Sequence, residues 1–362
     1  MSISHLSQEQ VKKLARHFTG HGSMIYRGTS PENSSPLYAY LSQQIAADPA
    51  LLSLVAEADQ STTITNLFFG AVHFLLLSGS EHPLRAYYPD MSTTTRPPEE
   101  AFPTFREFCL EHAEKIREIV TTRYVQTNEV RRCAGLFPAF SLLASRLEHQ
   151  PLAIVEIGAS AGLHLLWDRY AYDYGSGQIL GKPDSPVHIR SSVRGPYPLP
   201  AMTSLPEVIY RIGLDINPLN VQDPNDTRWL RALIWPEHAD RLQLLEAALK
   251  VARQEPPTLV AGDAAAILPE VLAQVPGEAA LCVFHSYVLN QMPESVRQRI
   301  LEHIAQHARQ RNLFQLAQDG YSLRTPPQLR LYTYQQGKMQ TEYLANCESH
   351  GRWLEWLLPP KA

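Results

Sequence analysis

The sequence predicts an α/β fold, with an all-helical N-terminal region followed by a mostly parallel β-sheet that is flanked by helices. Up to about residue 150, apolar residues recur at helical spacing. From about residue 151, short apolar runs alternate with amphipathic stretches, which is typical of βαβ units. Two late apolar runs on either side of a short turn predict a closing antiparallel hairpin. We therefore expect two domains, residues 1–150 and residues 151–362.

The composition is that of a globular protein with a substantial core. Of 362 residues, 44% are hydrophobic and 19% are charged, which argues against wholesale disorder. Lysine and arginine together number 32 and the acidic residues 36, so the formal net charge is −4. Because no run of about five or more like charges occurs, a protein that coats nucleic acid is not expected. We expect a small-molecule substrate instead.

Neither a membrane span nor a disulfide framework is predicted. The most apolar window, residues 67–77, is interrupted by Gly70 and His73 and is shorter than the roughly 20 residues that cross a bilayer. The N-terminus lacks the features of a secretory signal, so we expect a cytoplasmic protein. The four cysteines form no Cys-x-x-Cys pair, so we expect buried thiols and no metal site.

Capping residues and prolines locate the expected helices of the first region. A serine or aspartate caps a helix, and proline is favoured at its first position. These signals place helix starts at Ser7, Ser35-Pro36, Asp48-Pro49 and Pro103. Gly20 is expected to end the first helix. Residues 88–98 are polar and contain prolines, and they predict a loop at the cleft.

Five apolar runs predict the parallel strands of the second region. They span residues 152–157, 208–214, 258–261, 280–284 and 313–316, and the closing hairpin follows at 329–334 and 339–344. A helix beginning at Pro293 is expected to pack on this sheet. The connection between the first two strands is far longer than the ~20 residues of a simple βα unit. We expect an irregular insertion over about residues 171–206.

A glycine-rich turn follows the first of these strands and precedes an expected helix. Residues 158–162 read Gly-Ala-Ser-Ala-Gly, and small residues there let the backbone approach a ligand. The helix N-terminus would offer unpaired N–H groups to something polar or anionic. In an open parallel sheet, ligands bind in the crevice at the carboxyl ends of the strands.

Acidic residues at the next two strand ends favour a nucleoside-containing cofactor. Asp215 closes the second strand and would accept hydrogen bonds from ribose hydroxyls, whereas Asp263 follows the third and would accept one from an adenine amino group. This arrangement resembles the class I methyltransferases, whose first motif is acid-x-Gly-x-Gly-x-Gly. Ser160 stands in place of the middle glycine.

The methyltransferase resemblance implies a Rossmann-like fold and S-adenosylmethionine as cofactor. Gly158, Ser160 and Gly162 would approach the methionine part, and Arg132 or Asn128 would clamp its carboxylate. His285, which follows the fourth strand, would be the general base on the acceptor side. An Asn/Asp-Pro-Pro-Tyr motif is absent after that strand, which argues against methylation of DNA adenine or glutamine. The helical region would cover the cleft.

Other interpretations of the same turn stay open. Gly158 to Gly162 also matches the Gly-x-Ser-x-Gly nucleophile elbow of serine hydrolases, with Ser160 as nucleophile. A later acid, Asp215 or Asp263, and a later histidine, His285 or His350, would complete the triad. Alternatively, the chain is a non-catalytic module that binds a nucleoside or a protein, or the glycines serve only the packing of a helix on a strand.

Longer motifs point to one family. The segments VEIGASAGLHLLWDRYAYDYG (155–175), GLDINPLNVQDPNDTRWLRALIWPE (213–237), VFHSYVL (283–289), QTNEVRRC (126–133) and HGRWLEWL (350–357) resemble the bacterial domain-of-unknown-function family 2332. That family has no established activity. The resemblance implies that the two regions form one architectural unit. The positions that it implies at the cleft are Glu156, Gly158, Gly162, Asp215, Asn217, Asp263, His285, Gln126, Asn128, Glu129 and Arg132.

Overall fold

The structure is a computed structural model in which the chain forms two compact units. It describes residues 7–28, 31–58, 63–147, 150–201, 205–320 and 325–360. Unit 1 comprises Met1–Thr127 and Pro224–Leu242, and unit 2 comprises Asn128–Asp223 and Gln243–Ala362. These divisions differ from the expected boundary at residue 150, because the helix that ends at Arg146 groups with the sheet and residues 224–242 group with the N-terminal helices.

Unit 1 is helical in the residues that the structure describes. Its elements are α1 (Gln8–Arg16), η1 (His17–Gly22), α2 (Ser23–Arg27), η2 (Pro31–Asn33), α3 (Pro36–Ala46), α4 (Pro49–Ser53), α5 (Ile64–Leu77), η3 (Pro83–Tyr87), η4 (Pro98–Glu100), α6 (Ala101–Glu111), α7 (Ala113–Thr122) and α9 (Pro224–Ala232). The boundary between the units falls inside α10 (Ala239–Gln254).

Side-chain caps at Ser7, Ser35 and Asp48 confirm three of the predicted helix starts. Two expectations for this unit were wrong. The chain does not leave helical structure at Gly20, because the π-helix η1 continues through it to Gly22. The helix expected from Pro103 begins at Ala101 and is divided at His112 into α6 and α7.

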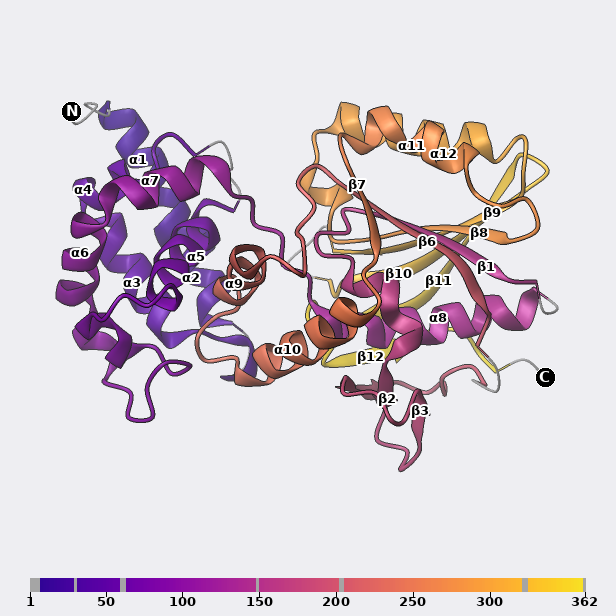
Figure 1. Ribbon diagram of the computed structural model, residues 1–362, viewed down its shortest axis with the longest axis horizontal. Coiled ribbons are helices and arrows are strands. Elements are labelled where there is room, and N and C mark those ends of the chain that lie inside the picture. The colour runs from indigo at the N-terminus through magenta and orange to yellow at the C-terminus, as the bar shows by residue number, and fades with distance from the viewer. Residues whose placement is uncertain are drawn as a thin grey trace. The chain divides into compact units, whose positions relative to one another are not determined.

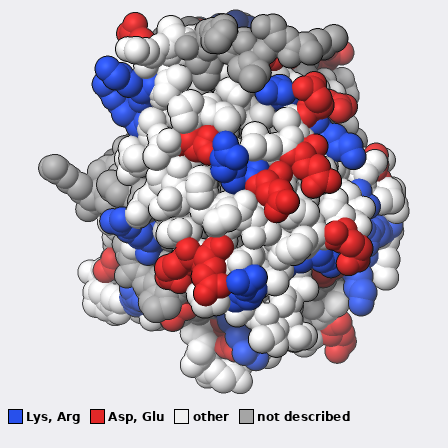
Figure 2. All heavy atoms as spheres, turned by 90° about the vertical axis from the view of Figure 1, so that its left-hand side faces the viewer, with Lys and Arg blue, Asp and Glu red and all other residues white. Residues whose placement is uncertain are grey.

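The core of unit 1 forms around α5, the most apolar segment of the sequence. Phe69 stacks on Tyr38 with ring centroids 4.1 Å apart. The distant segment α9 joins this core, since the ring of Trp229 contacts Phe74 of α5 with centroids 6.0 Å apart. The indole N–H of Trp229 also donates to the carbonyl of Tyr124 over 2.8 Å. Among the described residues, no helix is long and apolar enough to cross a membrane. On the face of unit 1 drawn in Figure 2, positive and negative side chains are interspersed.

Unit 2 is built on a mixed sheet of nine strands among the described residues. Its strand order is β5-β12-β11-β10-β9-β8-β1-β6-β7. The strands are β1 (Leu152–Ile157), β5 (Ser192–Arg194), β6 (Val208–Asp215), β7 (Thr258–Ala261), β8 (Ala280–Ser286), β9 (Leu313–Asp319), β10 (Gln328–Gln335), β11 (Lys338–Cys347) and β12 (Trp353–Trp356). The strands β7, β6, β1, β8 and β9 are parallel. From β9 through β10 and β11 to β12, each strand is antiparallel to its neighbour.

Helices cover both faces of this sheet, as Figure 1 shows. On one face lie α11 (Ala264–Ala273) and α12 (Glu294–His307), which share a buried apolar cluster with β1 and β8. On the other lies α8 (Cys133–Arg146), whose Phe140 contacts Phe284 with centroids 5.7 Å apart. The predicted α/β fold, with its parallel strands and closing hairpin, is therefore confirmed.

Three parts of unit 2 differ from the expectation or extend it. The turn at Gly162 leads into the short 3₁₀ helix η6 (Leu163–Arg169) rather than the expected apolar α-helix. The insertion is not wholly irregular, because β2 (Ala171–Asp173), β3 (Ile179–Gly181) and β4 (His188–Arg190) form a small separate sheet. The C-terminal tryptophans lie in β12, a strand of the main sheet.

All four cysteines are buried and unpaired, as predicted: Cys109, Cys133, Cys282 and Cys347.

The close packing of β6 against the glycine turn yields a first prediction. A Cβ added at Gly213 would lie 2.5 Å from Ala159 Cβ and 2.7 Å from a Leu259 methyl group. We expect Gly213→Ala to lower the free energy of unfolding by about 1–3 kcal/mol through overpacking, measured by urea denaturation. Gly277→Ala is the matched control, because nothing lies within 4 Å of the added carbon. Equal stabilities of the two variants would contradict this packing.

Candidate functional site

The candidate site lies at the carboxyl ends of the parallel strands. The five parallel strands follow one another along the chain as β1, β6, β7, β8 and β9. In the sheet, they lie in the order β7-β6-β1-β8-β9. The order therefore reverses between β1 and β8, and such a switch point is where open α/β sheets bind ligands. Residues 158–162 leave the end of β1 there, and residues 287–288 leave the end of β8.

The backbone is strained on both sides of this switch point. Ser160 has φ 54° and Tyr287 has φ 56°, in the left-handed region that side chains other than glycine seldom occupy. The two loops also meet, because a Cβ on Gly158 would lie 2.4 Å from a Val288 methyl carbon. Left-handed non-glycine residues persist only when their surroundings hold them, and they cluster at functional sites.

Asp215 holds the glycine turn in place. Its Oδ2 accepts a 2.7 Å hydrogen bond from the backbone N–H of Ser160, and its Oδ1 accepts a 2.9 Å bond from that of Asn217. The Asp215 carbonyl accepts from the N–H of Gly262 over 2.9 Å. One residue thus connects the ends of β1, β6 and β7. The structure brings Ser160, Asp215 and Asn217 together, as the sequence predicted.

Asp263 has a structural task of its own. It is the N-cap of α11, and its Oδ1 accepts a 2.9 Å hydrogen bond from the N–H of Ala265. The residue is exposed to solvent. A carboxylate has about four lone-pair directions, so the cap does not use up its capacity to accept hydrogen bonds.

Glu156 and His164 form a buried pair behind the turn. Glu156 Oε1 lies 2.9 Å from His164 Nδ1, and His164 Nε2 lies 2.9 Å from the carbonyl oxygen of Glu129. Because a carbonyl only accepts, Nε2 must carry a proton. A neutral ring with its proton on Nε2 has none on Nδ1, so a hydrogen bond between Nδ1 and Glu156 Oε1 requires a second proton, shared between these two atoms. Burial is the main cause that raises the pKa of Glu156, whose side chain is 1% exposed.

The segment from Asn128 to Arg132 packs on this pair. Asn128 Oδ1 accepts a 2.9 Å hydrogen bond from the N–H of Leu163, and the carbonyl of Glu129 accepts from His164. Arg132 donates from Nε to the carbonyl of Ser349 over 3.0 Å, and its guanidinium lies 4.1 Å from the centre of the Tyr287 ring. The Tyr287 hydroxyl is buried and has no hydrogen-bond partner among the described residues.

Gln126 belongs to unit 1, whereas the other predicted positions belong to unit 2. Within unit 2, His285 does not join this group. His285 is 1% exposed, and its Nδ1 lies 3.3 Å from Asp319. Since side chains alternate along a strand, His285 shares the face of Leu281 and Val283 in the cluster below α11 and α12, whereas Glu156 lies on the α8 face. Burial is the main cause that lowers the pKa of His285.

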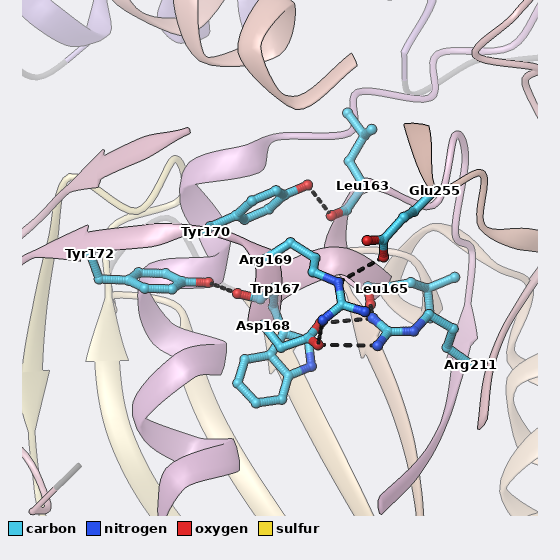
Figure 3. A network of polar contacts seen from close by, with 9 residues as sticks. All are labelled: Leu163, Leu165, Trp167, Asp168, Arg169, Tyr170, Tyr172, Arg211 and Glu255. Atoms are coloured by element: carbon cyan, nitrogen blue, oxygen red, sulfur yellow. Dashed lines mark hydrogen bonds and ion pairs between the residues drawn. The ribbon is translucent and has the colours of Figure 1, made fainter. Parts of the chain in front are cut away.

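Sequence reasoning missed the residues that fix η6. Figure 3 shows Asp168 and Arg211 pointing at each other, with bonds of 2.7 and 3.1 Å from the guanidinium to the two carboxylate oxygens. Arg169 donates to Glu255 over 2.8 Å. The hydroxyl of Tyr170 donates to the carbonyl of Leu163. Arg211 and Glu255 come from distant parts of the chain, and the pattern Trp-Asp-Arg-Tyr was the signal available in the sequence.

The serine hydrolase alternative receives little support from this geometry. The two histidines considered for it lie near other acids, His285 by Asp319 and His350 by Glu348, at 3.3 and 3.6 Å. The Asp215 carboxylate accepts backbone N–H groups of the turn. Among the described residues, no three histidine, cysteine or acidic side chains are placed to hold a metal ion.

Comparison with known families gives one match over most of the chain. The model of an uncharacterized protein family conserved in bacteria, DUF2332, matches residues 27–356. The chain belongs to this family. Searches among curated proteins and among solved structures give no match. The DUF2332 match spans the glycine turn, Asp215 and the segment from Asn128 to Arg132, which are the elements of the candidate site.

The buried Glu156 predicts a pH dependence of stability. A carboxyl whose pKa is higher in the folded than in the unfolded chain stabilises the fold below about pH 4.3 and loses that contribution as the pH rises toward the folded value. We expect the wild type to lose stability relative to Glu156→Gln across that window, by about 1.4 kcal/mol per unit of raised pKa. Urea denaturation at a series of pH values measures this, with Glu302→Gln, an exposed site, as control. A wild type that keeps or gains stability relative to Glu156→Gln as the pH rises would contradict it.

The left-handed conformation of Ser160 predicts an unusual order of stabilities. At φ 54°, glycine avoids the Cβ strain of alanine, so Ser160→Gly is expected to be about 1 kcal/mol more stable than Ser160→Ala. The comparison is made by chemical denaturation of the two variants. Ala159→Gly is the neighbouring control, where glycine should destabilise. A Ser160→Ala variant as stable as Ser160→Gly would show that the turn is not strained.

Proposed function

We propose that unit 2 of this DUF2332 protein binds S-adenosylmethionine at residues 158–162 and transfers its methyl group to a small molecule. The observation that carries this proposal is the strain at Ser160 and Tyr287, which lie on the two sides of the switch point of a parallel sheet. Strain retained at the place where such sheets bind ligands favours a ligand-binding turn over one that serves packing alone.

The acidic residues of the site suit the cofactor's ribose and adenine. One Asp215 oxygen accepts from the turn at Ser160 and the other accepts from the N–H of Asn217. Because a carboxylate has about four lone-pair directions, it would also accept from ribose hydroxyls. It would therefore position the turn and bind the sugar with the same group. Asp263, exposed at the end of β7, would accept from the adenine amino group while it caps α11.

The polar groups behind the turn suit the methionine part. Glu156 Oε2 is buried without a hydrogen-bond partner among the described residues, so it is available to accept from an amino group. Arg132 brings a positive charge near Glu156 and Tyr287, where it lowers the pKa of both groups against the stronger effect of burial. The cofactor carboxylate would lie near this guanidinium.

Catalysis in this scheme rests on positioning. S-Adenosylmethionine supplies an activated methyl group on a sulfonium, and the chain would hold the acceptor in line with it. Val288, which follows β8 and lies against Gly158 of the turn, would border the acceptor side together with the preceding Tyr287. His285 takes no part, because it lies on the opposite face of the sheet from Glu156.

A calorimetric titration of the full chain with S-adenosylhomocysteine tests the proposal. We expect binding to the wild type, and about 10-fold or greater weakening in Asp215→Asn and Asp263→Ser, since a hydrogen bond to a charged group contributes roughly 1.5–3 kcal/mol. Asn keeps the size of Asp215, and Ser keeps the cap of α11. Asp184→Ser, an exposed acid in the insertion, is the control and should bind as the wild type does.

Two readouts separate loss of binding from loss of folding. Each variant is compared with the wild type by circular dichroism and thermal unfolding before titration. Absence of binding to wild-type protein that is folded and stripped of co-purified ligand would overturn the proposal. Equal affinity in all three variants would place the ligand elsewhere in the molecule.

A further inference from the structure

A second group of buried polar atoms lies in unit 1, among residues that the proposed function does not use. Four oxygen atoms there are buried and have no hydrogen-bond partner within the described residues: Tyr38 OH, Tyr88 OH, Asp90 Oδ1 and Glu237 Oε2. Tyr38 is 2% exposed and Tyr88 is 0% exposed. Buried polar atoms are nearly always satisfied in folded proteins, so four in one unit require an explanation.

These four residues come from three chain segments that meet in unit 1. Tyr38 lies on α3, Tyr88 and Asp90 lie in the loop after η3, and Glu237 lies between α9 and α10. The rings of Tyr38 and Tyr88 contact each other edge to face with centroids 6.3 Å apart. The side chain of Glu237 is anchored through its other oxygen, which accepts a 3.1 Å bond from the N–H of Leu37 on α3.

The charges of the group are predominantly negative. Burial raises the pKa of Tyr38, and Tyr88, Asp90 and Glu237 raise it further in that order. The neighbouring charge that acts on Glu237 is Asp90, a like charge. His73 lies against Asp90, with Nε2 2.9 Å from Oδ2. The groups influence one another electrostatically, and none of the four oxygens has a hydrogen-bond partner among the described residues, which is the arrangement expected around a small occupant.

We propose that these four oxygens bind one monovalent cation of about the size of a water molecule, K⁺ or NH₄⁺. Two carboxylate oxygens supply the charge and two phenol oxygens complete the set. A divalent ion is disfavoured, because Ca²⁺ and Mg²⁺ are held in proteins by carboxylates, carbonyls and waters, whereas two of these four oxygens are phenols; moreover, no metal-type cluster of acidic and histidine side chains occurs in the described part of the chain. The site is independent of the cofactor site in unit 2.

Thermal unfolding of the full chain in different salts tests this site. The protein is dialysed into N-methylglucamine chloride and then titrated with KCl or NH₄Cl at constant ionic strength, so that general screening stays fixed. A cation that binds only the folded chain raises the melting temperature saturably, by about 3 °C at ten times its dissociation constant. The two salts reveal which ion is preferred.

Replacement of the two tyrosines by phenylalanine tests whether a cation binds the four oxygens. If a cation binds these oxygens, the double variant Tyr38→Phe/Tyr88→Phe loses the salt-dependent rise and melts below the wild type in KCl or NH₄Cl. If nothing binds them, removal of two unsatisfied hydroxyls leaves the melting temperature unchanged or raises it in every salt, and this result overturns the proposal. Glu237→Gln should also abolish the salt effect.

Tyr172→Phe is the matched control. The hydroxyl of Tyr172 is buried in unit 2 and donates to the carbonyl of Trp167 over 2.6 Å. Its removal should lower the melting temperature by the same amount in each salt and leave the salt-dependent rise intact. A salt effect that this variant also abolishes would show that the cation acts elsewhere.

Discussion

The hydrogen bond from the Ser160 N–H to the Asp215 carboxylate is the interaction on which the candidate site depends. A left-handed serine is unfavourable by itself, and a charge-assisted bond of 2.7 Å to a nearly buried acid is what offsets that cost. The same carboxylate holds Asn217, and its own carbonyl holds Gly262. Hydrogen bonds to one residue therefore link the ends of three strands, which is the kind of support that preorganises a site.

A second constraint lies directly below this turn. Glu156 is buried in the centre of the sheet, where an unpaired carboxylate would be costly. His164 compensates it, and the carbonyl of Glu129 fixes the ring of His164. His164 belongs to η6, and Glu129 precedes η5 (Val130–Arg132). The hydrogen bonds of His164 to Glu156 and to the carbonyl of Glu129 therefore connect both segments to β1. The turn is thus supported by Asp215 at Ser160 and by the Glu156–His164 pair behind it.

The local features of unit 2 could be predicted from the sequence, whereas its long-range pairs could not. Short apolar runs locate β1, β6 and β7, and polar residues at their ends locate the edge of the sheet where the candidate site lies, because both signals are contained in a few neighbouring residues. The pair Arg211–Asp168 and the face of His285 depend on which strands are neighbours. In the same way, α5 is evident from its hydropathy, but its contact with α9 is not.

Asp215 and Asp263 could serve the structure, a ligand, or both. Asp215 and Asp263 each have a structural partner, a turn N–H or a helix N–H, and structure alone would account for an acid at either position. A neutral side chain such as serine or asparagine could cap α11 equally well. The strain at Ser160 and Tyr287 is different, because no packing role requires a non-glycine residue in that conformation. It is on this strain at the end of the parallel strands, rather than on the acids, that the proposal of a binding site rests.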